Sequence, residues 1–478
     1  MHDPLDMAPF AERRDVFAST LGDGVAVIPG ARQSTGHSGR FRQDSDFYYL
    51  TGFDEPDAVA VINPSHDKER YVLFVRPSDR FAEMWDGRRA GVDGAIGDFG
   101  ADAAYPVSDL DRKLREYLIG SRTLHYRLGN RDYDDKILNF LRHAPAVRTH
   151  GRTVVESITD PRLVLHEMRL RKTMSEIGRL RTACEITAAG HVEAMLVAAP
   201  GMHEYEVQAA IEHTFRRLGS ARDSYESIVA AGANACILHY TSNNALIGED
   251  DLLLVDAGAE YGYLAGDITR TFPASGTFSG PQKELYEIVL AANEAAIALA
   301  RPGLPFREIH ETARRVITEG LVALGVLPRG VEDSLSMWHD REFFPHGTGH
   351  WLGMDVHDVG AAKVDRVSRP LEPGMAFTIE PGIYFDPARE SVEFALLPID
   401  EEALWERRLR LGQGAKAEED AEREGAEKVR HPVPERFRGI GIRIEDDILV
   451  TESGCEVLTG GVPKSVAEVE AMCREGAG

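Results

Sequence analysis

The chain has 478 residues, of which 43% are hydrophobic and 28% are charged, and its formal net charge at pH 7 is −24. This composition is typical of a globular protein, and the length predicts two domains, because a single core rarely grows beyond about 300 residues. The excess of acidic residues argues against a nucleic-acid partner, because phosphate binding needs clustered Lys and Arg.

The sequence gives no sign of secretion or of membrane attachment. Its first residues, MHDPLDMAPFAERRD, lack the basic start and the apolar core of a signal peptide. No apolar run approaches the ~20 residues that a membrane span needs. The four cysteines are scattered and form no C-x-x-C pair, which argues against a disulfide framework or a thiolate zinc site. We therefore expect a cytoplasmic protein with no membrane partner.

The first part of the chain alternates short β-like runs with helical stretches, which indicates a small α/β domain. Apolar and partly β-branched runs, bounded by Pro, Gly, Asp and Asn, predict strands at Val25–Ile28, Ala58–Ile62 and Tyr71–Val75. Two further segments, Asp111–Leu118 and Asp135–His143, are predicted to be helices.

The rest of the chain contains two helix pairs with related sequence patterns. Thr173 and Glu176 have the capping-box spacing, and the helix that they begin ends at Pro200-Gly201. A second helix opens at Ser279-Gly280-Pro281, where Pro suits a first turn, and ends at Pro302-Gly303. Each Pro-Gly turn is followed by an amphipathic helix and by β-rich sequence that contains acidic residues. We therefore expect two related half-domains with a site that draws ligands from both; the alternative is a chance likeness.

One segment fits neither half-domain. Residues 401–434, EEALWERRLRLGQGAKAEEDAEREGAEKVRHPVP, are dense in charge and poor in β-forming residues. This composition predicts an inserted surface loop with one short helix around Leu404–Leu411.

The strongest chemical signal lies in the segment DDLLLVDAGAEYGYLAGDITRTF. Asp256 ends an apolar run, and Asp267 begins a second β-like run. A hairpin centred on Tyr261 and Gly262 places the two aspartates opposite each other, with Cβ atoms about 5 Å apart. Facing carboxylates in buried strands repel each other and lose hydration, and neither strand contains Lys, so we infer a metal. The alternative is a solvent-exposed hairpin with two incidental aspartates.

Two glutamates repeat this pattern further along the chain. MAFTIEPGIYF places Glu380 in an apolar strand, and GIGIRIEDDILVT places Glu445 in another, on the same face as Arg443. Arg443 next to a buried carboxylate also fits a structural ion pair, and the sequence leaves both interpretations open.

Three histidines, His346, His350 and His357, lie close together in HGTGHWLGMDVHD, separated by glycines that let the backbone approach closely. A lone histidine is usually a hydrogen-bonded core residue, but three so close together indicate a site. Four carboxylates with one imidazole and no thiolate suit Mn²⁺ or Co²⁺ better than a structural zinc site. Four carboxylates also balance two divalent ions, which at a separation of about 3.5–4 Å hold a bridging hydroxide at neutral pH.

These residues lie in motifs that resemble aminopeptidase P and the related Xaa-Pro dipeptidases of the pita-bread metallopeptidase family. The resemblance covers nearly the whole chain and rests on RQDSDFYYLTGF (Arg42–Phe53), ILHYTSNN (Ile237–Asn244), VDAGAEYGYLAGDITRTFP, HGTGHWLGMDVHDVG, TIEPGIY and GIGIRIEDDILVT. It implies an α/β (α+β) fold, with a creatinase-like N-terminal domain over residues 1–160. The implied pita-bread catalytic domain covers residues 161–478 and has internal pseudo-two-fold symmetry.

The resemblance also implies a role for each candidate site residue. It assigns metal ligation to Asp256, Asp267, His350, Glu380 and Glu445, and so singles out His350 among the three histidines. It implies that His239, His346 and His357 contact the substrate or the reaction intermediate, and that Tyr384 and Arg443 lie close to the metals. We add the hypothesis that Glu380 relays a proton to the leaving proline nitrogen.

The expected activity is that of an aminopeptidase that releases the N-terminal residue from peptides with proline in the second position. Two divalent ions are expected as cofactors, Mn²⁺ first, with Co²⁺ or Zn²⁺ as alternatives. An Xaa-Pro dipeptidase is the second interpretation, and a catalytically inactive pita-bread protein that serves as a binding scaffold is a third. A methionine aminopeptidase is disfavoured because the chain has an additional N-terminal domain. We expect a homodimer or a homotetramer.

The segment 401–434 is additional to the family pattern and connects the strands of Glu380 and Glu445. It is therefore expected near the mouth of the site or at a subunit contact, and the alternative is a solvated excursion without a role. The motif Arg42–Phe53 favours an aminopeptidase, whereas the arginine run of the segment offers a charge that would cap the pocket for a dipeptide; the run is Arg407, Arg408 and Arg410.

Overall fold

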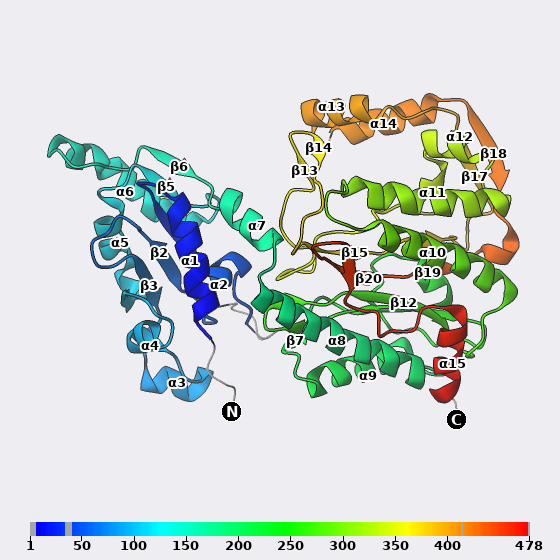
Figure 1. Ribbon diagram of the computed structural model, residues 1–478, viewed down its shortest axis with the longest axis horizontal. Coiled ribbons are helices and arrows are strands. Elements are labelled where there is room, and N and C mark those ends of the chain that lie inside the picture. Colours follow the sequence, from blue (N-terminus) through cyan, green and yellow to red (C-terminus); the bar gives the residue numbers. More distant parts are fainter. Residues whose placement is uncertain (1–5, 34–40, 413, 477–478) are drawn as a thin grey trace. The chain divides into compact units, whose positions relative to one another are not determined.

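The computed structural model describes residues 6–33, 41–412 and 414–476. The chain divides into two compact units, Met1–Arg169 and Leu170–Gly478, each with a hydrophobic core of its own (Figure 1). Among the described residues, no helix is both long enough and apolar enough to cross a membrane.

The first unit is built on a six-stranded mixed sheet with the strand order β4-β3-β2-β1-β5-β6. Its strands are β1 (Val25–Pro29), β2 (Val59–Ile62), β3 (Tyr71–Val75), β4 (Ala103–Pro106), β5 (Thr123–His125) and β6 (Ser157–Thr159). Neighbours among β1, β2 and β3 are antiparallel, and the outer pairs are parallel. The three predicted strands are confirmed, and every residue of β2 and β3 is buried.

Seven helices of this unit are described. They are α1 (Ala8–Thr20), α2 (Ser45–Thr51), α3 (Arg80–Asp86), α4 (Gly91–Gly97), α5 (Leu110–Leu118), α6 (Arg131–Thr149) and α7 (Arg162–Leu170). The two predicted helices are confirmed as α5 and as the middle of α6. The longer α6 begins with two acidic residues, Asp132 and Asp134, which suit the positive end of the helix dipole.

The second unit contains two long helices, each packed against the helix that follows it. These are α8 (Met174–Val197) with α9 (Glu204–Arg217), and α10 (Gly280–Leu299) with α11 (Arg307–Ala323). The predicted capping box of α8 is confirmed, and Ser279 and Gln282 form another at α10. In Figure 1 the strands β12 (Ile268–Pro273), β15 (Ala376–Ile379), β19 (Gly441–Arg443) and β20 (Asp446–Val450) lie between the two helix pairs, and side chains from both pairs belong to one core. Two shorter helices are α12 (Val331–Ser336) and α15 (Val466–Gly476).

The strands of the second unit form small antiparallel sheets. Between α9 and α10 lie β7 (Arg222–Asp223), β8 (Ile228–Ala231), β9 (Leu252–Ala257), β10 (Ala259–Tyr261), β11 (Leu264–Ala265) and β12 (Ile268–Pro273). After α11 lie β13 (Lys363–Val364), β14 (Val367–Ser368), β15 (Ala376–Ile379), β16 (Gly382–Tyr384), β17 (Ser391–Ala395), β18 (Lys428–Pro432), β19 (Gly441–Arg443), β20 (Asp446–Val450) and β21 (Cys455–Val457). The sheets that matter for the site are β8-β9-β12, β7-β10-β11, β15-β20-β21 and β16-β19.

The hairpin that carries the two aspartates has a different register from the predicted one. Asp256 pairs with Thr269, so Asp267 does not stand directly opposite Asp256. The turn is centred on Gly262 and Tyr263, with φ angles of 55° and 66°, one residue later than predicted. Positive φ at both central residues is the pattern of a type I′ turn, whose twist matches that of the flanking strands. The prediction was wrong because glycine suits either central position and a left-handed tyrosine is rare.

The charged segment 401–434 contains two helices where the sequence predicted one. α13 (Glu401–Leu411) and α14 (Gly414–Gly425) pack against each other and form the connection in the chain from β17 to β18, which pair with each other (Figure 1). The sequence does not predict the second helix, because high charge density also indicates irregular structure. Ala, Glu, Lys and Arg, which dominate this stretch, are good helix formers.

Candidate metal centre

One cavity of the second unit collects the candidate residues. It has a volume of about 510 Å³, and all five predicted metal ligands line it: Asp256, Asp267, His350, Glu380 and Glu445. The walls also include four of the other candidates, His239, His346, His357 and Arg443. Tyr384 lies behind this lining, where its hydroxyl contacts His346 and Arg443. No described residue of the segment 401–434 lines the cavity.

The four candidate carboxylate ligands lie at or near the ends of strands. Asp256 is close to the end of β9, and Asp267 lies in the gap between β11 and β12. Glu380 follows β15, and Glu445 lies in the gap between β19 and β20. The pairs β15-β20 and β16-β19 share one register, which places Glu380 opposite Glu445. The directly opposed carboxylates predicted for the aspartates are therefore found at the glutamates.

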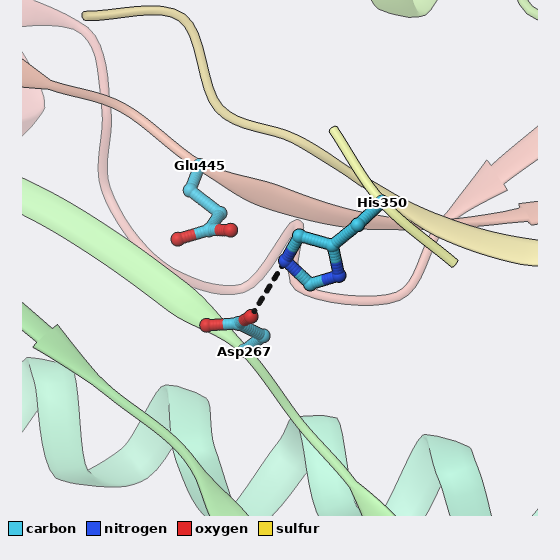
Figure 2. A group of neighbouring side chains, drawn as sticks. All are labelled: Asp267, His350 and Glu445. Atoms are coloured by element: carbon cyan, nitrogen blue, oxygen red, sulfur yellow. Dashed lines mark ion pairs between the residues drawn. The ribbon is translucent and has the colours of Figure 1, made fainter. Parts of the chain in front are cut away.

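Three of the candidate ligands converge most closely. Asp267, His350 and Glu445 each offer an atom within 4.8 Å of the other two, and Figure 2 shows the His350 ring reaching between the two carboxylates. His350 Nε2 lies 3.5 Å from Asp267 Oδ2 and 3.6 Å from Glu380 Oε1. The other ring nitrogen, Nδ1, lies 3.1 Å from the carbonyl oxygen of Trp351 and donates to it. This contact turns Nε2 toward the carboxylates.

Tyr225 joins the two aspartates and was not found from the sequence. Its hydroxyl lies 2.5 Å from Asp256 Oδ1 and 2.5 Å from Asp267 Oδ1. Burial and the charges of both aspartates raise its pKa well above the ordinary value, so it keeps its proton. Tyr225 precedes the buried strand β8 by a few residues, which is a weak signal, because only the β8-β9 pairing brings it to the aspartates.

Arg443 is a buried cation that contacts one of the candidate ligands. It is 4% exposed, and its Nη2 donates to Asp256 Oδ2 over 2.5 Å. Its Nε donates to Thr269 Oγ1 over 3.0 Å, and the Thr269 hydroxyl in turn donates to Glu445 Oε2 over 2.6 Å. The ion pair that Arg443 forms is therefore with Asp256, whereas the one that the sequence left open was with Glu445, and Arg443 also lines the cavity.

A chain of hydrogen bonds leads from Arg443 to His346. Arg443 Nη1 donates to the Tyr384 hydroxyl over 3.0 Å, and that hydroxyl lies 2.9 Å from His346 Nε2. His346 Nδ1 lies 2.7 Å from the carbonyl oxygen of Gly347, which only accepts, so Nδ1 carries the proton and Nε2 accepts from Tyr384. Burial and the charge of Arg443 lower the pKa of His346 to about 4, so the ring is neutral at pH 7.

Two more histidines face the same space. The ring of His357 lies 4.1 Å from the ring of His350, centre to centre. Burial and the neighbouring His350 lower the pKa of His357, so its ring is neutral at pH 7 and offers one N–H. His239 comes from the loop after β8 and lines the same cavity.

The carboxyl groups of the centre have too little positive charge around them. Burial and mutual repulsion raise the pKa of Glu445 well above its ordinary value. Burial raises the pKa of Asp267, and that of Glu380 to about 7, despite the nearby charge of His350. A divalent cation supplies the missing charge, and oxygen ligands with one imidazole form a site of the kind that such ions occupy in proteins. The residues present therefore fit a divalent metal.

Comparison with known proteins agrees with this chemistry. Residues 178–452 match the metallopeptidase family M24, and residues 10–125 match the N-terminal domain of aminopeptidase P. The chain belongs to metallopeptidase family M24. As a member of this family it is a peptide-bond hydrolase that binds divalent metal. The family resemblance and the mixed α/β fold expected from the sequence are both confirmed.

Full-length relatives extend the match to both units. The Xaa-Pro aminopeptidase of Escherichia coli (strain K12) is 41% identical over 469 residues, 97% of each chain. Xaa-Pro aminopeptidase 3 of Homo sapiens is 31% identical over 442 residues, 91% of this chain and 77% of the relative. The structure of aminopeptidase PepP of Pseudomonas aeruginosa covers 99% of both chains at 41% identity with a TM-score of 0.88. Zn-substituted aminopeptidase P of E. coli in complex with product covers 99% of both chains at 39% identity, with a TM-score of 0.86.

Proposed function

We propose that this M24 peptidase is an Xaa-Pro aminopeptidase that works with two divalent metal ions. The observation that carries the proposal is the convergence of four carboxylates and one imidazole in a single cavity, from Asp256, Asp267, His350, Glu380 and Glu445. Four carboxylates balance the charge of two divalent ions, and dinuclear sites of this kind are used for hydrolysis. Relatives named Xaa-Pro aminopeptidase that match both units support the choice of substrate.

The ligand chemistry favours Mn²⁺ or Co²⁺, because oxygen-rich sites suit these ions. Zn²⁺ is compatible with the same ligands, and aminopeptidase P of E. coli has been solved in a Zn-substituted form. When bound, divalent ions lower the pKa of the water that contacts them and stabilise negative charge on a carbonyl oxygen.

The other residues of the cavity bind and orient the peptide and move its protons. His239 and His357 offer ring N–H groups to the carbonyl oxygen of the bond before proline. The carboxylate of Glu380 accepts a proton and delivers it to the proline nitrogen, which must be protonated to leave. Arg443 and Tyr384 hold the neutral ring of His346 in one orientation at the cavity wall.

The cavity suits a proline in the second position. Proline has no amide N–H, and its φ is fixed near −65°, so a peptidase that grips the N–H of an extended backbone cannot hold it. Part of the lining is apolar, from Ile228, Leu238 and Val356, and offers contacts to a ring without requiring that hydrogen bond.

The second candidate is an Xaa-Pro dipeptidase. In that case a cation would pair with the carboxylate of the dipeptide and close the pocket. The guanidinium of Arg407 is already paired with Glu422, Arg410 is exposed on α13, and the side chain of Arg408 lies outside the described part of the structure. We expect kcat/KM for an Xaa-Pro-Yaa tripeptide to be at least as high as for the matching Xaa-Pro dipeptide. A strong preference for the dipeptide would assign the chain to the dipeptidases.

Two further tests complete the proposal. An inactive binding protein would hold peptides without hydrolysing them, so turnover of a tripeptide with proline second, with and without added Mn²⁺, separates the two. Assembly as a homodimer or homotetramer and a cytoplasmic location remain predictions, and the mass in solution and the fractionation of cells test them.

A further inference from the structure

Two buried polar side chains, one on each long helix, form hydrogen bonds with the backbone of the strands that carry the candidate metal ligands. They are Thr187 on α8 and Asn293 on α10, both 0% exposed. Each lies fourteen positions after the N-cap residue of its helix, which is Thr173 for α8 and Ser279 for α10. The same place on each helix therefore presents a polar group to the strands.

After α11, a proline interrupts the strand pairing at the ligands. The shared register of β15-β20 and β16-β19 pairs Pro381 with Ile444, and the N–H of Ile444 donates to the carbonyl of Pro381 over 3.3 Å. A hydrogen-bonded antiparallel pair normally exchanges two such bonds. Pro381 has no N–H, so the second hydrogen bond of this pair cannot form, and the carbonyl of Ile444 receives no hydrogen bond from the opposite strand. This gap lies one position along the strands from the facing pair of Glu380 and Glu445.

Asn293 supplies the missing donor. Its Nδ2 lies 3.4 Å from the carbonyl oxygen of Ile444 and 3.1 Å from that of Ile379, and donates to both. These two carbonyls belong to the residues that precede Glu445 and Glu380. The far end of the amide is fixed by Lys464, whose Nζ donates to Asn293 Oδ1 over 2.9 Å. One side-chain amide therefore joins the two strands beside their facing glutamates.

Asn293 is itself anchored in a buried network. Lys464 also donates to Asp446 Oδ2 over 2.8 Å, and Arg270 donates to Asp446 Oδ1 over 2.7 Å. Arg270 reaches back to the ligand strand, where its Nη1 donates to the carbonyl of Glu445 over 2.5 Å. Arg270 and Asp446 are both 0% exposed and the Lys464 side chain is 23% exposed, so the strand that carries Glu445 is held by a largely buried network.

Thr187 acts at the corresponding point of the other strand pair. The N–H of Gly266 donates to the carbonyl of Ala259 over 3.0 Å, whereas the N–H of Ala259 donates to Thr187 Oγ1 over 2.9 Å. A Cβ on Gly266 would lie 2.5 Å from Thr187 Oγ1, so glycine is needed for the hydroxyl to come this close. The next residue is Asp267, and Thr187 thus fixes the backbone beside that ligand.

We propose that Thr187 and Asn293 are positioning residues of the metal centre, an inference that rests on the proposed two-metal function. Each forms a hydrogen bond with a backbone group at a point where the regular pairing of two strands is interrupted, next to a carboxylate that faces the metals. Together they set the positions of Asp267, Glu380 and Glu445 relative to one another. They touch neither the substrate nor the metals, and act through the backbone on either side of the ligands.

Four substitutions test this proposal by titration of the metal-free protein with Mn²⁺ in a calorimeter. Thr187→Val keeps the shape of the side chain and removes its hydroxyl, and Thr187→Ser restores the hydroxyl. Asn293→Asp keeps the shape and the contact with Lys464 but has no N–H to donate. Thr182→Val is the matched control, because within the described residues the Thr182 hydroxyl bonds only to the carbonyl of Gly178 in its own helix.

We expect Thr187→Val and Asn293→Asp to weaken binding of the second Mn²⁺ at least tenfold, and to lower kcat at least tenfold with KM within twofold. Thr187→Ser and Thr182→Val should bind Mn²⁺ as the wild type does. Wild-type Mn²⁺ affinity in both Thr187→Val and Asn293→Asp, even with a lower melting temperature, would overturn the proposal. Thr187→Val decides the matter alone if Asn293→Asp does not fold. Because the titration needs no turnover, a wild type without peptidase activity would refute the proposed function and leave this result standing.

Discussion

The metal centre and the segment 401–434 are both dense in charge, but water reaches them very differently. At the centre, Asp267 and Glu445 are 4% and 2% exposed, and the carboxylates outnumber the nearby cation Arg443. In the segment, Arg407 is paired with Glu422, whose side chain is 56% exposed. Charge density by itself therefore does not identify a site. Buried charge of one sign, without an equal amount of the other, does.

Removal of a ligand carboxylate should have the largest effect. Asp267→Ala leaves the remaining ligands with too little negative charge and one open position, so metal uptake and turnover should both be lost. We expect kcat/KM to fall by at least about a thousandfold, because metal activation of water and charge stabilisation are lost together. Elemental analysis of the purified variant and hydrolysis of an Xaa-Pro-Yaa peptide measure the two effects. An active Asp267→Ala variant with no bound metal would contradict the proposed centre.

Metal removal should make the stability of the protein depend on pH through Glu380. Burial raises the pKa of Glu380 from 4.5 to about 7, so the folded state holds this proton more tightly than the unfolded state does. The stability that this provides is present below pH 4.5 and is lost as the pH rises through 7. With chelator present, the wild type should lose up to about 3 kcal/mol relative to Glu380→Gln between these values.

Urea unfolding of both proteins at pH 5 and at pH 7.5 measures this difference. Glu380→Gln controls for the burial and shape of the side chain, because the amide has nearly the size of the carboxyl group and does not titrate. A stability difference that stays constant over the pH range would show that Glu380 does not lack positive charge in the metal-free centre.

The residues that meet in the cavity could be selected from the sequence as candidate ligands because acidic residues are conspicuous in apolar strands, as with Asp256 and Glu445. The capping box of Thr173 was readable for a similar reason, since its signal lies within one turn of helix. The register of the aspartate hairpin could not be predicted, because it depends on which residues of the turn adopt a positive φ. Here Tyr263 is one of them.

Contacts between segments that are distant in the chain could not be predicted from the sequence. Tyr225 reaches Asp267 only through the pairing of β8 with β9 and β9 with β12. Asn293 meets the ligand strands because α10 packs on them, and an asparagine inside a long apolar helix carries no signal of its own. Periodicity and spacing describe one element at a time, whereas these groups act between elements.

Loss of the Tyr225 hydroxyl should have a moderate effect. Tyr225→Phe keeps the ring and removes the group that holds Asp256 and Asp267 together. A hydrogen bond to a charged group contributes about 1.5–3 kcal/mol, so Mn²⁺ affinity should fall by about ten- to a hundredfold. Calorimetric titration measures this, and Tyr126→Phe, which removes a hydroxyl bound to Asp134 in the first unit, is the control. Equal affinities for the two variants would show that Tyr225 has no part in holding the ligands.

Removal of the charged helices should have the smallest effect on chemistry. Replacing residues 402–425 by a short Gly-Ser linker deletes most of α13 and α14 but leaves β17 paired with β18. Exposed ion pairs such as Arg407 with Glu422 stabilise a protein by only about 0–1 kcal/mol, and no described residue of the segment lines the cavity. We expect kcat for a tripeptide to stay within twofold of the wild type.

Two further measurements then decide what the helices do. A lower kcat/KM for long peptides alone would place them at the mouth of the site, and a smaller mass in solution would place them at a subunit contact. If neither changes, the segment is a solvated excursion, and its exposed, paired charges have no part in the reaction that the buried, unbalanced charges of the centre support.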